Sequence, residues 1–118
     1  MEPILERILL INDVRFYLSL FKLHKSYLLL LSDQKEMGIG SVTLSSPYLI
    51  EGVKTSSSSY SLFGIENKIA NKLIVERMAN LLNTPVLLLS FLKTKMAEED
   101  FIKPVMICLN EMVSVLPN

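Results

Sequence analysis

The sequence predicts one α+β domain: a mostly antiparallel sheet of five or six strands, with two helices on one face. Three observations lead to this fold class. Alternating apolar strands occupy the N-terminal half, two helical patterns occupy the C-terminal half, and 118 residues leave room for one core. Because helices that follow strands in the chain are typically layered against one sheet, residues 1–118 are expected to form a single domain.

Period-two alternation predicts the strands. Apolar and polar side chains alternate from Val14 to Phe21, and "YLLLL" at 27–31 follows a hairpin turn at 24–26. A second turn, rich in Asp and Gly, leads to "SVTLS" at 41–45, where Val42 and Leu44 are expected to face inward. The simplest arrangement of these strands is a three-stranded meander.

The C-terminal half contains a helix, a strand and a second helix. The first helix runs from about residue 65 to the "NTP" stop at 83–85, because the residue before a proline avoids the helical region. "VLLLSFL" at 86–92 is apolar at nearly every position, which is typical of a central strand. The final helix is expected from about Phe101, after three acids that suit a helix N-terminus. The expected inward side of the first helix contains Ile65, Ile69, Ala70, Leu73, Ile74, Met78 and Leu81.

The sequence contains no recognisable catalytic, cofactor or metal motif. The single histidine, His24, lies in a predicted turn without a nearby acid, and the single cysteine, Cys108, lies among apolar residues of the final helix. "GIG" at 38–40 leads into a strand instead of a helix, so it is a turn and not a dinucleotide fingerprint. The serines at 56–59 have no base beside them, which predicts a connecting loop. We therefore expect a protein that is not an enzyme and has no catalytic, metal or cofactor residues.

The balance of charge and the distribution of apolar residues limit the classes of partner that the sequence favours. Twelve basic and twelve acidic side chains cancel, so the sequence does not favour nucleic acid or an anionic membrane surface. No charge-free stretch reaches the ~18 to 20 apolar residues of a membrane span. One cysteine is consistent with a reducing compartment, and we expect the cytoplasm and also the nucleus.

The far face of the predicted sheet needs a cover. Two amphipathic helices cover one face, yet "YLLLL" and "VLLLSFL" are apolar in both parities, and each exposed Leu or Val costs about 1.5 to 3 kcal/mol. Either a partner's sheet packs there, or "PILERILLIN" at 3–12 folds back as a helix. Strand parity assigns to the partner interface Phe16, Leu18, Leu20, Leu29, Leu31, Leu87, Leu89 and Phe91.

Several strings resemble the small proteasome assembly chaperones, in particular the family of proteasome assembly chaperone 4 and its fungal equivalent. These strings are "SYSLFG" at 59–64, "NTPVLLLSFL" at 83–92 and "EMVSVLP" at 111–117, and the similarity extends from Val14 to Pro117. The resemblance implies an ATP-independent chaperone that pairs with a paralogous small subunit, sheet against sheet. It also implies that this heterodimer binds an α-type proteasome subunit and promotes assembly of the α ring.

Two other classes of protein remain open on the sequence alone. A longin- or roadblock-type subunit of a trafficking complex also pairs small α+β domains, although those folds place a helix earlier in the chain. A small dimeric thioesterase-like enzyme has a suitable size, although no acid, base or nucleophile is placed at a strand end.

Overall fold

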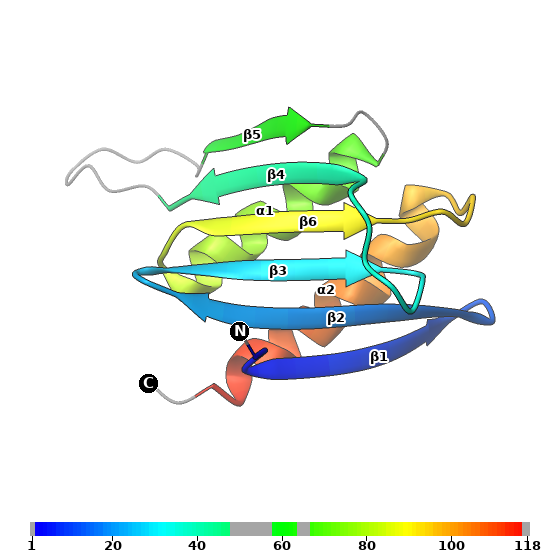
Figure 1. The fold of residues 1–118 in the computed structure, drawn as a ribbon, viewed down its shortest axis with the longest axis horizontal. Helices are drawn as coiled ribbons and strands as arrows, with labels where there is room; N and C mark the ends of the chain where they lie inside the picture. Colours follow the sequence, from blue (N-terminus) through cyan, green and yellow to red (C-terminus); the bar gives the residue numbers. More distant parts are fainter. Residues whose placement is uncertain (1, 48–57, 64–66, 117–118) are drawn as a thin grey trace.

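A computed structural model describes residues 2–47, 58–63 and 67–116. Six strands form one sheet, and both helices lie behind it in Figure 1. The α+β class, the mostly antiparallel sheet and the placement of both helices on one face are confirmed. The elements are β1 (Leu5–Ile11), β2 (Val14–Leu23), β3 (Ser26–Ser32), β4 (Ser41–Ser46), β5 (Ser58–Phe63), α1 (Lys68–Leu82), β6 (Val86–Phe91) and α2 (Glu98–Ser114).

The strand order is β1-β2-β3-β6-β4-β5, and every neighbouring pair is antiparallel except β3–β6, which is parallel. The predicted three-stranded meander is therefore wrong, because β6 inserts between β3 and β4. The central position predicted for "VLLLSFL" is confirmed. This nearly all-apolar strand gains most from a place where neighbours flank both of its edges.

The N-terminal segment forms edge strand β1, so the alternative of a helix folded over the far face is wrong. Asn12 and Asp13 join β1 to β2 in a two-residue turn, with φ values of 48° and 65°. Asn and Asp tolerate this left-handed region, and two positive-φ residues match the twist of a hairpin. The Asn-Asp pair between two apolar runs is the sequence signal for this hairpin.

The core lies between the sheet and the two helices. Phe16 of β2 stacks on Phe101 of α2, with ring centroids 5.6 Å apart. Helix α1 buries Ala70, Ile74 and Met78, as the sequence predicts. The other apolar residues assigned to its inward side that the structure describes are exposed, namely Ile69, Leu73 and Leu81. The prediction is wrong for these three residues, because α1 has apolar side chains on its outer surface as well as on its inner surface.

Asp33, just after β3, fastens the loop that follows β6. Its Oδ1 accepts a hydrogen bond from the Lys93 backbone N–H at 2.9 Å, and its Oδ2 accepts one from the Thr94 N–H at 2.7 Å. Burial by itself raises the pKa of Asp33, but these bonds, together with those from the Thr94 hydroxyl and Gln34, outweigh it and leave the pKa below its ordinary value. The ionised carboxylate is therefore the form that the fold stabilises.

The "GIG" segment belongs to the connection between β3 and β4, which passes over the end of β6 in Figure 1. A side chain at Gly38 would place its Cβ 2.8 Å from the Phe91 ring, and one at Gly40 would collide with the Ser90 carbonyl oxygen. Both glycines are there because the connection lies directly on β6. Close approach of two backbone segments, as well as chain reversal, explains this motif.

Glu98, one of the three acids at the start of α2, caps the N-terminal end of α1. Asn67, before α1, makes no side-chain capping bond, and the first turn of α1 contains no acid. The Ala70 N–H instead donates to Oε2 of Glu98 at 2.5 Å. Glu98 therefore holds the N-terminal ends of both helices together, in addition to its expected role in its own helix.

Candidate partner-binding face

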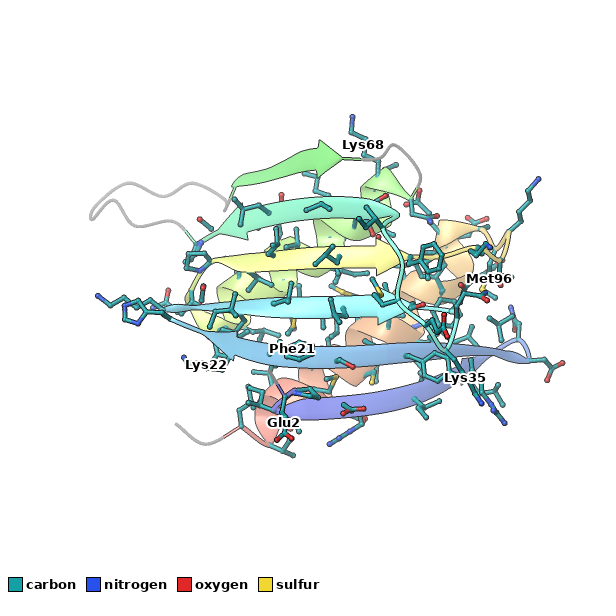
Figure 2. All side chains as sticks on the ribbon, viewed as in Figure 1. Glu2, Phe21, Lys22, Lys35, Lys68 and Met96 are labelled. Atoms are coloured by element: carbon teal, nitrogen blue, oxygen red, sulfur yellow. The ribbon has the colours of Figure 1, made fainter. Side chains whose placement is uncertain are left out.

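The sheet face opposite the helices is the candidate functional site. It is turned toward the reader in Figure 2, where Phe21 of β2 is labelled. Strand pairing aligns its side chains in three rows. These rows are Phe21, Leu28, Leu87 and Leu44; Glu6, Ser19, Leu30, Leu89 and Val42; and Ile8, Tyr17, Ser32 and Phe91. Most members are uncharged and apolar, which is typical of the centre of a protein interface.

Strand β4 has an inverted polarity. Its buried side chains, which face the helix layer, are Ser41, Thr43 and Ser45, whereas Val42 and Leu44 lie on the open face. The prediction that Val42 and Leu44 face inward is therefore wrong. Small polar residues under α1 let the helix, with its buried Ala70 and Ala79, lie close to β4. A strand that points its largest apolar side chains away from its own core indicates a second apolar environment.

The eight residues predicted at the partner interface divide between the two faces. Leu87, Leu89 and Phe91 lie on the open face and are partly buried in the isolated chain. The other five, at most 1% exposed, belong to the core beneath the helices, and their assignment is corrected: Phe16, Leu18, Leu20, Leu29 and Leu31. Parity groups side chains within a strand, but it does not say which group the helices cover.

The residues that sequence reasoning missed are the opposite parity of the same strands. On β3, "YLLLL" is apolar in both parities, so Leu28 and Leu30 face out where Leu29 and Leu31 face in. On β1, the outermost strand at its end of the sheet, Ile8 and Leu10 are 67% and 65% exposed. The sequence of β1 does not alternate, because Glu6 and Arg7 are followed by four apolar residues, so no period of two marked it as a strand.

The size of the open face is that of a modest interface. Five strands at ~4.8 Å spacing and three rows ~6.8 Å apart give about 500 Å² of plane area. This is at the upper end of apolar patches on monomers, and a corrugated surface of that extent approaches the ~800 Å² per partner of a stable complex.

Charged side chains stand at the margins of the face. Glu6 lies on the edge strand, Arg15 at the start of β2, and Lys93 beyond the end of β6. The Lys93 ammonium is 5.9 Å from the centroid of the Phe91 ring, a cation–π contact. An apolar centre with a charged rim is the usual anatomy of a protein–protein interface.

The residues with catalytic potential are far apart in the fold. His24 is exposed in the β2–β3 turn, and Cys108 is buried on α2, where burial and, to a lesser degree, Glu111 raise the pKa of its thiol. Both positions agree with the sequence prediction. Ser58 and Ser59 lie in β5, so the predicted loop is wrong for these two serines, while Ser56 and Ser57 are outside the described residues.

Within 2–47, 58–63 and 67–116, no group of three or more His, Cys, Asp or Glu side chains is arranged to hold a metal ion. Neither helix in this part of the chain has the length and apolar content that crossing a membrane requires.

Comparison with known proteins places this fold among solved structures. No protein-family model and no curated protein matches the sequence. The fold is similar to that of a chain in a solved structure described as the crystal structure of a novel chaperone complex for yeast 20S proteasome assembly. The similarity has a TM-score of 0.63 and covers 94% of this chain and 91% of the other. At 8% sequence identity, it establishes a shared fold.

Proposed function

We propose that this protein is a non-enzymatic assembly chaperone that pairs with a paralogous small subunit through its open sheet face. In this proposal the heterodimer binds an α-type subunit of the proteasome core particle and promotes assembly of the α ring. The protein acts in the cytoplasm and the nucleus, without a cofactor.

The inverted polarity of β4 carries the proposal. Val42 and Leu44 join Leu87 and Leu89 on a surface that the chain's own helices do not cover. Folding of the isolated chain leaves these side chains only partly buried, although full burial stabilises each side chain of that size by about 1.5 to 3 kcal/mol. A second sheet stacked at about 10 Å would bury the two rows that contain Leu87 and Leu89 at once, while the β3–β4 connection already lies against Phe91 in the third row.

Fold similarity supports the choice of partner. The likeness to a chain of a yeast 20S proteasome assembly chaperone complex extends over 94% of this chain. The strings "SYSLFG", "NTPVLLLSFL" and "EMVSVLP" point to the same group of proteins. The fold and the strings are separate observations, and both are consistent with a small chaperone subunit.

The test is purification of the tagged protein from the cells that produce it, with mass spectrometry of the proteins that accompany it. We expect a second protein of similar size, together with α-type but not mature β-type proteasome subunits. The matched variant Leu89→Glu should lose the small partner, whereas Ile107→Glu, on the exposed side of α2, should retain it. Recovery of a homodimer alone, or of trafficking components, would show that the proposal is wrong.

A further inference from the structure

A groove lies between the N-terminal ends of α1 and α2, which begin at the same end of the sheet in Figure 1. Its volume is about 490 Å³, within the range of ligand pockets. It lies in the helix layer, away from the open sheet face. The lining residues are Ile69, Ala70, Leu73, Ala97, Glu98, Glu99 and Ile102.

The groove exposes large apolar side chains that the fold leaves without cover. Ile69 is 69% exposed and Leu73 is 47% exposed, one helical turn apart on α1. The side of the same helix that faces the sheet buries Ile74 and Met78. A helix that is apolar beyond its core-facing stripe indicates contact with something else.

The charged side chains that line the groove indicate which kind of segment could bind there. Among the described residues, the charged side chains that line the groove are Glu98 and Glu99, both carboxylates on α2. Glu98 is engaged by the Ala70 N–H, while Glu99 is exposed. Lys68 and Lys72 of α1 are exposed outside the lining. An apolar floor beside an acidic wall complements a segment that carries both apolar and basic side chains.

A contact between the helices limits the length of the groove. Nε of Arg77 donates a hydrogen bond to Oδ1 of Asn110 at 3.2 Å, which joins α1 to α2 on the C-terminal side of the groove. From Ile69 to this bridge α1 rises by about 12 Å, or roughly two helical turns. The groove therefore fits a short segment and not a whole domain.

We propose that this groove is a second docking surface, which binds a short amphipathic segment of another protein with apolar residues one helical turn apart and a Lys or Arg beside them. This site goes beyond the proposed function and does not depend on it. Because the groove and the open sheet face lie on opposite layers, both can be occupied at once.

The test uses two fluorescein-labelled helical peptides of about 14 residues, which is near the length at which isolated helices become stable, with the same Leu spacing. One places Lys beside the Leu residues and the other places Glu there. Fluorescence anisotropy measures the affinity of each, and ¹⁵N NMR of the full chain maps the amides that shift. We expect the Lys peptide to bind more tightly and to shift amides near 69–73 and 97–102.

Two variants in the groove and one control outside it test whether the peptide binds at this site. Leu73→Asp should weaken binding of the Lys peptide by about tenfold or more, because it places a charge on the apolar floor. Glu99→Lys should weaken it about two- to fivefold and improve binding of the Glu peptide. The control Ile107→Asp alters an exposed isoleucine of α2 outside the groove and should change neither affinity.

The outcomes separate this site from the open sheet face. The proposal is overturned if the Lys peptide does not bind, if Leu73→Asp leaves its affinity unchanged, or if the Glu peptide binds equally well. It is also overturned if the shifted amides map to the open face. Leu89→Glu, which tests the proposed function, should leave peptide binding intact, so failure of one proposal is distinguishable from failure of the other.

Discussion

Leu89→Glu is the most direct test of the open sheet face. Leu89 lies at the centre of the face, between Leu30 of β3 and Val42 of β4, and is partly buried in the isolated chain. Its side chain points away from the helices, so a carboxylate there remains in contact with water in the monomer. We expect the free energy of unfolding of the isolated chain to fall by about 1 kcal/mol.

The effect on the complex is much larger. When a partner sheet covers the face, the carboxylate that this substitution introduces becomes a buried charge without a counter-ion, which costs about 3 to 5 kcal/mol. At about 1.4 kcal/mol per tenfold change, the Kd for the partner should rise by about a hundredfold to several thousandfold. Arg15 lies two strands away at the start of β2, and Glu6 has the same charge as the introduced glutamate, so neither supplies a counter-ion.

Sedimentation velocity and size-exclusion chromatography with light scattering, on wild type and variant with the co-purified partner, measure this difference. Ile107→Glu is the matched control, because it introduces the same charge at an exposed apolar residue of α2. Thermal unfolding followed by circular dichroism verifies that both variants fold. A Leu89→Glu complex as stable as wild type would refute the assignment of this face to a partner.

Three further variants test contacts inside the fold. Asp33→Asn should lower the free energy of unfolding at pH 7 by about 1 to 3 kcal/mol, since it weakens two charge-assisted bonds to Lys93 and Thr94. Because the pKa of Asp33 is lowered on folding, the wild-type advantage is complete above the ordinary pKa of 3.8 and is lost as the pH falls below it. Urea unfolding at pH 7 and pH 3 checks this, and a gap between the two proteins that does not narrow at pH 3 would contradict it. Glu98→Ala should cost about 0.5 to 2 kcal/mol through the lost cap on Ala70, whereas the neighbouring Glu99→Ala should change stability by less than about 0.5 kcal/mol in urea unfolding. Equal effects of the two substitutions would argue against the cap. Gly40→Ala should destabilise by about 1 to 3 kcal/mol, because its Cβ meets the Ser90 carbonyl, and an unchanged urea midpoint would refute that contact.

The predicted elements were largely found, since local patterns decide them. Alternation over β2, the turn at His24 and Lys25, and the helix stop at Asn83 depend on neighbours within a few residues. Asn83 adopts φ 53° at the end of α1, a conformation that asparagine tolerates. Edge strand β1 was missed because its apolar run has no period of two and also suits a helix, and the Asn-Asp turn was its one local signal.

The sequence by itself determined the fold class, the two helices and the presence of more apolar strand surface than two helices cover. Only the tertiary structure decided which side of each strand faces the helices, since a period of two groups side chains without saying which group faces inward. It also placed β6 between β3 and β4, which aligned Leu87 and Leu89 with Val42 and Leu44 on one face. These choices come from strand register and helix packing, which join residues far apart in the chain, and a local pattern contains no information about them.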